Sequence, residues 1–262
     1  MPIMLGWRRV GVWLLVLAMC GATAARADEL ITLSTRSGVT VSYWHMPRAT
    51  ATATLVLLTG GSGNIGMRDG RPQSGNFLVR SRDLFAAEGF NVAIVGRPSD
   101  VTDMDTAFRA SAAHMQDLTS VIDDLLARAK VPLWLVGTSR GTVSATAAAI
   151  AIGPPRLAGV VLTSSITAFK LPGAVPTQRL SEVRVPVLVL HHEKDACPSC
   201  APHEVSWILS GLTQAPVKKL LWASGGEGAR GDPCEAFHWH GYVGMEAQAV
   251  QWIAAWVRQP TP

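Results

Sequence analysis

The stretch that decides the fold is residues 133–141, which read LWLVGTSRG. Four apolar residues lead into a glycine, two hydroxyl residues, an arginine and a second glycine, and a helical run of small residues follows at 142–152. Glycines on both sides of Ser139 permit a tight turn between a buried strand and a helix, and that turn lifts the serine hydroxyl above the sheet. The pattern predicts an exposed serine at the end of a buried strand.

Apolar strand-like runs alternate with helical patterns along the rest of the chain. We expect strands at residues 39–44, 54–58, 92–95, 133–136, 159–163, 187–191 and 218–222, and helices at residues 76–88, 106–129, 142–152, 203–212 and 245–257. Continuous Val, Leu and Ile runs are typical of strands buried on both faces, so the alternation predicts a mostly parallel central sheet flanked by helices. Ligand sites in such sheets lie beyond the C-terminal ends of the strands.

Residues 1–27 have the composition of an export signal. A pair of arginines precedes an uncharged apolar run over 10–19, and the segment ARA at 25–27 places small residues before a cut at Asp28. The apolar run is shorter than the roughly 20 residues of a membrane-spanning helix. We therefore expect a signal peptide over 1–27, a single domain over 28–262, and a periplasmic or secreted protein.

The expected signal peptide, residues 1–27, is the leader of this chain, and it also accounts for most of the net positive charge. The chain has 23 Lys and Arg against 19 Asp and Glu, a formal charge of +4, and the leader holds three arginines and no acidic residue. Nucleic-acid binding needs clustered positive charge, so we expect no nucleic-acid partner and no stable membrane insertion after signal removal. A chain that is 48% hydrophobic and 16% charged can bury a core, which excludes disorder. The oligomeric state is left open.

A serine hydroxyl is a weak nucleophile that needs a general base, itself oriented by a carboxylate. Acidic residues follow the expected strand at 187–191, and two histidines follow the last expected strand. We expect Asp195 to be the acid and His240, which directly precedes the final helical pattern, to be the base. Glu193 and His238 are the alternatives.

Attack on a carbonyl develops negative charge that backbone N–H groups stabilise. One donor is expected at Arg140, directly after the serine, and the other in the loop TGGSG at 59–63, with Gly61 as first candidate and Ser62 as second. The segment GSGNIG at 61–66 also matches a dinucleotide-binding pattern. No immediate helix and no acid at the end of the next strand accompany it, so we expect no cofactor.

Together these motifs resemble the α/β-hydrolase superfamily, over nearly the whole chain from about residue 39 to residue 257. The motifs are GTSRG at 137–141, TGGSG at 59–63, HHEKD at 191–195 and HGY at 240–242. The resemblance implies an α/β-hydrolase fold and a small exported serine hydrolase. It also implies a carboxylic ester substrate, a Ser139, His240 and Asp195 triad, an acyl-enzyme intermediate and no metal.

Two features bear on the kind of hydrolase. Thr59 stands where the family usually has His, and only residues 164–186 separate two expected strands at the usual position of a lid domain. The short segment favours an open site with a minimal lid. The alternatives on the same fold are a serine peptidase, a thioesterase, an acyltransferase and a non-catalytic ligand-binding protein.

Three cysteines lie beyond the leader, and disulfides persist in exported proteins. Cys197 follows the expected acid by two residues and Cys234 precedes the expected base by six, so a contact between acid and base brings these cysteines together. We expect a Cys197–Cys234 disulfide, with Cys200 as the alternative to Cys197. A redox motif at CPSC and a zinc site are weaker interpretations, since neither a thioredoxin-like unit nor a second paired ligand spacing is present.

Two further groups of side chains have open roles. Arginines in loops after strands are interpreted as solvated, with an anionic-substrate pocket as the alternative: Arg68, Arg71, Arg97 and Arg140. Tryptophans in helical or strand patterns are expected in the core or in groove walls: Trp207, Trp222, Trp252 and Trp256.

Overall fold

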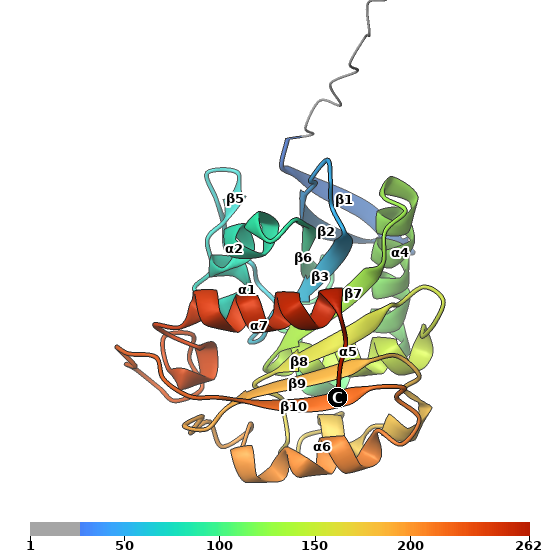
Figure 1. Ribbon diagram of the computed structural model, residues 1–262. Helices are drawn as coiled ribbons and strands as arrows, with labels where there is room; N and C mark the ends of the chain where they lie inside the picture. The colour runs from blue at the N-terminus through green and yellow to red at the C-terminus, as the bar shows by residue number, and fades with distance from the viewer. Residues whose placement is uncertain (1–26) are drawn as a thin grey trace, which may run out of the picture.

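The computed structural model describes residues 27–262, so the predicted leader falls almost entirely outside this part of the chain. An eight-stranded sheet in the order β1-β2-β6-β3-β7-β8-β9-β10 runs through the centre of the molecule (Figure 1). The strands are β1 (Glu29–Arg36), β2 (Val39–Met46), β3 (Ala53–Leu58), β6 (Phe90–Pro98), β7 (Leu133–Thr138), β8 (Gly159–Thr163), β9 (Val187–His192) and β10 (Lys218–Ala223). The pairs β1–β2 and β2–β6 are antiparallel and the others are parallel, which confirms the predicted mostly parallel sheet.

Two strand features were not predicted. β1 alternates exposed and buried residues as an antiparallel edge strand does, and it turns into β2 at Gly38, whose φ of 71° is in the left-handed region. A second short hairpin follows the glycine-rich loop, in which β4 (Met67–Arg68) pairs with β5 (Arg71–Pro72). Neither segment is a run of apolar residues, so the pattern used for the buried strands does not find them.

The helices are α1 (Phe77–Arg80), α2 (Arg82–Ala87), α3 (Thr106–Arg109), α4 (Ala112–Arg128), α5 (Arg140–Ala151), α6 (Ser206–Gly211) and α7 (Glu246–Arg258). The helix expected over 106–129 is therefore two helices, because the Ser111 side chain accepts a hydrogen bond from the His114 N–H and caps a new one. The helix expected over 76–88 is likewise interrupted at Ser81.

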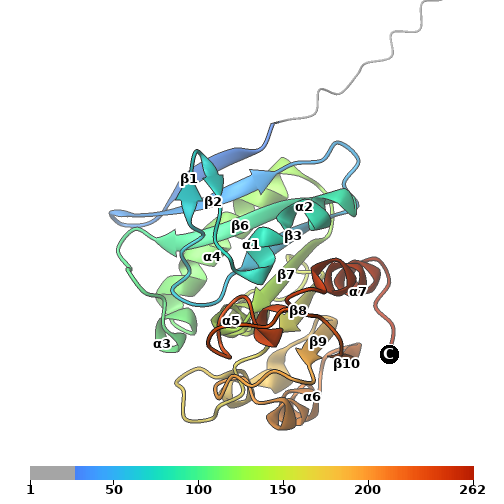
Figure 2. The ribbon, with the colours of Figure 1, turned by 90° about the vertical axis from the view of Figure 1, so that its left-hand side faces the viewer.

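Helices cover both faces of the sheet (Figure 2). Alternate residues of β3 point to opposite faces: Val56 and Leu58 pack in one core with α4, α5 and α6, and Leu55 and Leu57 pack in the other with α1, α2 and α7. A strand buried on both faces is a continuous apolar run, which is why its sequence identified it.

One of the four tryptophans departs from the expectation, since Trp207 on α6 is 59% exposed. Trp222 on β10 is 42% exposed and lines a surface hollow, which agrees with a groove wall. β10 is the last strand of the sheet and has a neighbour on one side only, so its residues are less covered than those of the central strands. Trp256 is buried and Trp252 is partly buried against the α7 side of the core, as expected.

The connection from β8 to β9 holds only two short 3₁₀ turns, Val175–Thr177 and Leu180–Glu182, in agreement with a minimal lid. Within residues 27–262, no helix combines the length and the apolar character needed to cross a bilayer.

A buried histidine between α4 and α5 predicts a loss of stability in acid. His114 is 2% exposed and its Nε2 lies 2.9 Å from the Ser144 hydroxyl. Burial, with help from the charges of Arg109 and Arg36, lowers the pKa of His114 to about 3. In the unfolded chain the pKa is about 6.5, so between these values the unfolded state binds a proton that the folded state does not. The stability that depends on neutral, buried His114 is therefore fully present above the unfolded-state pKa, and it is lost as the pH falls toward the folded-state pKa.

The test compares the free energy of unfolding of the wild type and of His114→Gln, measured by urea unfolding from pH 4 to pH 5.5. For each unit by which the pH is lowered, we expect the free energy of unfolding of the wild type to fall by about 1.4 kcal/mol more than that of the variant, which cannot bind this proton. Parallel stability curves for the two proteins would contradict the assignment.

Candidate active site

Ser139 lies at a sharp turn between β7 and α5, as expected. Its backbone has φ 51° and ψ −126°, a conformation that is strained for a residue other than glycine. Only glycine fits at the two flanking positions. A Cβ on Gly141 would lie 1.9 Å from the Leu58 carbonyl oxygen, and a Cβ on Gly137 would lie 2.5 Å from the Gly141 carbonyl oxygen. The Ser139 N–H donates to the Thr163 carbonyl of β8, which fixes the turn against the neighbouring strand.

The structure brings together the expected base and acid. His240 lies in the 3₁₀ turn Trp239–Gly241, and its Nδ1 is 2.9 Å from Asp195 Oδ2. Both residues are 4% exposed. Because a carboxylate only accepts, Nδ1–H donates to it and Nε2 is left as the proton acceptor. Asp195 Oδ1 accepts from the Cys197 N–H at 3.0 Å, so both carboxylate oxygens are held.

The alternative acid and base lie elsewhere. Glu193 is exposed and lines a separate surface hollow with Trp222. His238 packs edge-on against Trp239 and does not line the pocket that contains Ser139 and His240.

The predicted disulfide is present, between Cys197 and Cys234, and Cys200 is the free cysteine. The bond joins the loop that carries Asp195 to the loop that leads into His240. Burial raises the pKa of the Cys200 thiol, which lies beside Ser139 and hydrogen-bonds with its side chain. Cys197, Cys200 and His240 approach within 4.8 Å of one another, but the Cys197 sulfur is used in the disulfide and the remaining pair falls short of a zinc ligand set.

Loss of this disulfide should lower stability. The bond closes a loop between residues 37 positions apart, and its removal by Cys197→Ser with Cys234→Ser is expected to cost about 3–4 kcal/mol. Urea unfolding with and without dithiothreitol measures the effect. We expect reduction to lower the wild-type midpoint to that of the double variant and to leave the double variant unchanged. A wild-type midpoint that is insensitive to reductant would contradict a stabilising bond.

The glycine-rich loop, residues 60–63, passes directly over Ser139. A Cβ on Gly60 would lie 2.8 Å from the Ser139 Cβ, so only glycine allows this approach. Gly61 has φ 55°, and both Gly61 and Ser62 line the pocket. Arg140, whose N–H is the other expected donor, directly follows the serine as the first residue of α5.

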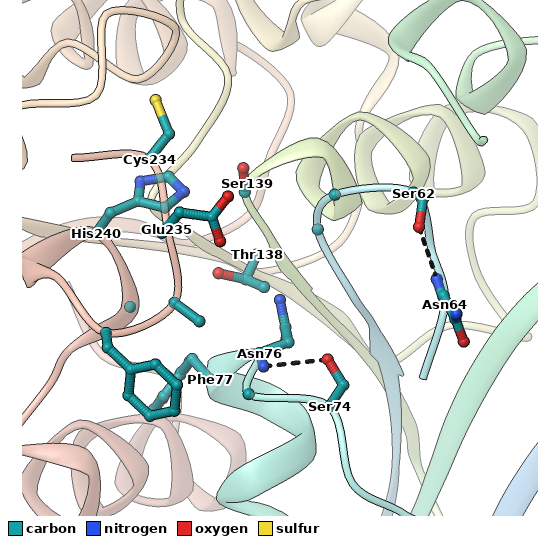
Figure 3. Close-up of a pocket in the computed structure, with 16 residues that line it drawn as sticks. Ser62, Asn64, Ser74, Asn76, Phe77, Thr138, Ser139, Cys234, Glu235 and His240 are labelled. Atoms are coloured by element: carbon teal, nitrogen blue, oxygen red, sulfur yellow. Dashed lines mark hydrogen bonds between the residues drawn. The ribbon is translucent and has the colours of Figure 1, made fainter. Parts of the chain in front are cut away.

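The pocket around Ser139 has a volume of about 370 Å³ and mostly polar walls (Figure 3). Glu235 is the one side chain with a formal charge at neutral pH among its lining residues, and none of the four loop arginines lines it. Arg140 instead pairs with Asp103 at 3.1 Å. These positions agree with solvated arginines and do not support an anion-binding pocket.

Asn76 and Glu235 are among the residues of this pocket that were not predicted from the sequence. The Asn76 side-chain oxygen accepts from the Leu78 N–H and caps α1, so the amide nitrogen is turned into the pocket (Figure 3). Glu235 directly follows the disulfide-bonded Cys234. The asparagine was identifiable only as a helix-capping residue, and the predicted disulfide placed Cys234 near the acid without indicating that Glu235 lines the pocket.

Solved structures with the same architecture share little sequence with this chain. An α/β serine hydrolase without a lid from Xanthomonas campestris is 18% identical, with a TM-score of 0.59 and coverage of 90% of this chain and 96% of that one. An acylaminoacyl peptidase from Pyrococcus horikoshii is 12% identical, with a TM-score of 0.61 and coverage of 89% and 41%. An esterase from Pyrococcus furiosus is 14% identical, with a TM-score of 0.57 and coverage of 75% and 82%.

No protein-family model and no curated protein matches the sequence. The likeness to solved structures extends over most of the chain, and it agrees with the strand order, the turn at Ser139 and the short β8–β9 connection. The chain therefore has the α/β-hydrolase fold, in a form with a minimal lid.

Proposed function

We propose that this protein is an exported serine hydrolase that cleaves carboxylic esters with Ser139, His240 and Asp195. The observation that carries the proposal is the buried hydrogen bond from His240 Nδ1 to Asp195 Oδ2, together with the position of His240 on the wall of the pocket that also contains Ser139. This bond leaves Nε2 free to take a proton, which is what a serine nucleophile requires of its base.

In the proposed reaction, Ser139 Oγ attacks the ester carbonyl carbon while its proton passes to His240 Nε2. The Gly61 and Arg140 N–H groups hold the oxygen that becomes negative, and the buried Asp195 carboxylate stabilises the imidazolium. Collapse of the tetrahedral intermediate breaks the bond to the alcohol, which leaves with the proton from His240. Water then attacks the acyl-enzyme by the same steps and releases the acid.

The pocket favours short, polar substrates. It is about 370 Å³ in volume, its walls are rich in serine, asparagine and glycine, and a minimal lid leaves its mouth open to water. Such walls give a long alkyl chain little apolar surface to cover. The single charged lining residue, Glu235, disfavours an anionic group close to the scissile bond.

Hydrolysis of p-nitrophenyl acetate, butyrate and laurate, with p-nitrophenyl hydrogen succinate as the anionic ester, tests this proposal. We expect kcat/KM for acetate and butyrate to exceed that for laurate and for the succinate by at least about tenfold. Absence of turnover of every ester would favour the ligand-binding alternative, and a preference for laurate would contradict the polar pocket.

We also propose that the protein is exported, that residues 1–27 are cleaved, and that residues 28–262 form a single mature domain. The Cys197–Cys234 disulfide supports it, because such bonds persist in oxidising compartments. N-terminal sequencing of the protein recovered from a periplasmic fraction should begin at Asp28. An uncleaved N-terminus on the active protein would contradict it.

A further inference from the structure

Arg109 is a buried arginine behind the glycine-rich loop. It is the last residue of α3 and is 1% exposed, and within residues 27–262 no carboxylate forms an ion pair with it. Burial, followed by the nearby charge of Arg140, lowers the pKa of Arg109 to about 9, while Asp103 and Asp105 raise it. The side chain is thus still a cation at neutral pH. A buried charge without an ion pair is costly, so its position needs an explanation.

All three nitrogens of the guanidinium donate to neutral oxygens. Nε donates to the Met104 carbonyl at 2.9 Å, Nη1 to the Ser144 hydroxyl of α5 at 3.2 Å, and Nη2 to the Gly61 carbonyl at 3.1 Å. Arg109 therefore ties the residue that we expect to donate to the oxyanion to the helix that follows Ser139.

Two other carbonyls of the loop are held as well. The Gly60 carbonyl accepts from the Gly63 N–H at 3.2 Å, and the Ser62 carbonyl accepts from the Met104 N–H at 3.1 Å. Gly63 is packed so closely that an added Cβ would lie 2.1 Å from Met104 Cε and 3.4 Å from Arg109 Nη2. Arg109 and Met104 do not line the pocket, so they hold the loop from its far side.

Two N–H donors of the same loop are free. In the described part of the chain, the N–H groups of Gly61 and Ser62 donate to no acceptor, although both residues line the pocket beside Ser139. A loop that has three of its four carbonyls held by hydrogen bonds, and the N–H groups of Gly61 and Ser62 available, is preorganised for a developing oxyanion.

We propose that Arg109 is a positioning residue that fixes the Gly61 carbonyl, and with it the direction of the Gly61 N–H toward the carbonyl group that Ser139 attacks. Its charge lies one hydrogen bond from the loop in a site removed from water, so it also stabilises negative charge on the substrate oxygen. This inference rests on the proposed hydrolase function. It assigns to Arg109 an effect on the transition state and not on the binding of substrate.

The test uses Arg109→Lys, which keeps the charge but not the three-way contact, and Arg109→Met, which removes both. The control is Arg36→Met. Arg36 is also a largely buried arginine, but it pairs with Asp117, and neither residue lines the pocket. We measure kcat and KM for p-nitrophenyl acetate, normalised to the fraction labelled by a fluorophosphonate. We also measure inhibition by a trifluoromethyl ketone, which adds to serine and forms an oxyanion.

We expect Arg109→Met to lower kcat about 100-fold and Arg109→Lys about tenfold, with KM within about threefold of wild type. Ketone binding should weaken in parallel with kcat, and Arg36→Met should keep the wild-type kcat. An unchanged kcat in folded Arg109→Met, a loss confined to KM, or unaltered ketone binding overturns the inference. Failure of both Arg109 variants to fold where Arg36→Met folds also overturns it, since the side chain would then serve the fold as a whole. If the wild type itself takes no label, the proposed function fails, and this inference fails with it.

Discussion

Replacement of Ser139 by alanine is expected to lower kcat for p-nitrophenyl acetate by about 10⁵- to 10⁶-fold. In the proposed reaction this side chain forms the bond to the acyl carbon, and its hydroxyl is presented at the turn between β7 and α5 by a strained backbone. The free N–H groups of Gly61 and Arg140 and the walls of the pocket remain in the variant. We therefore expect a residual rate above that of the reaction in water.

Ser62→Ala is the matched control for this variant. Ser62 lines the same pocket, and its hydroxyl makes only a long 3.4 Å contact with the Asn64 N–H. Its backbone N–H is unaffected by the change, so kcat should stay within a few-fold of wild type. Comparable losses in the two variants, or activity of Ser139→Ala above about 1% of wild type, would contradict a nucleophilic role for Ser139.

Asp195→Asn is expected to lower kcat by about 10⁴-fold with little change in KM. The carboxylate accepts from His240 Nδ1 at 2.9 Å and from the Cys197 N–H at 3.0 Å. An amide nitrogen facing His240 would require the ring to accept at Nδ1 and carry its proton on Nε2, where it cannot take the proton of Ser139. The neutral amide would also no longer stabilise the imidazolium.

Glu193→Gln, two residues earlier on the same loop, is the control for the acid. Glu193 is exposed and contacts neither His240 nor the pocket, so its substitution should leave kcat unchanged. Steady-state kinetics on both variants, with near-UV circular dichroism to verify the fold, separates the two candidates. A larger loss in Glu193→Gln than in Asp195→Asn would transfer the orienting role to Glu193.

The central part of the fold was predictable because it depends on local chemistry. The strands at β3, β7, β8 and β9 are buried on both faces and therefore read as apolar runs, and the two glycines around Ser139 are demanded by contacts under 3 Å. The order of the motifs along the chain then placed Asp195 and His240 at the same edge of the sheet.

The features that sequence reasoning missed depend on contacts between distant segments. Glu235 lines the pocket because the Cys197–Cys234 disulfide returns its loop to Ser139. The disulfide was predictable, but the path of the loop after Cys234 was not. Arg109 sits in a run that reads as continuous helix, and only the packing of α3 against α5 shows that its guanidinium contacts the Gly61 carbonyl. The loop arginines lie outside the pocket, in agreement with their interpretation as solvated, whereas the glutamate that lines it was not anticipated.

The most direct measurement of the central claim is covalent labelling of the mature, disulfide-bonded protein with a fluorophosphonate, followed by peptide mass spectrometry. We expect one adduct per molecule, on the peptide that contains Ser139, and we expect the adduct to disappear in Ser139→Ala and to form about 10⁴-fold more slowly in Asp195→Asn. A folded wild-type protein without an adduct, or an adduct on another residue, would contradict the proposal that Ser139 is the nucleophile of a serine hydrolase.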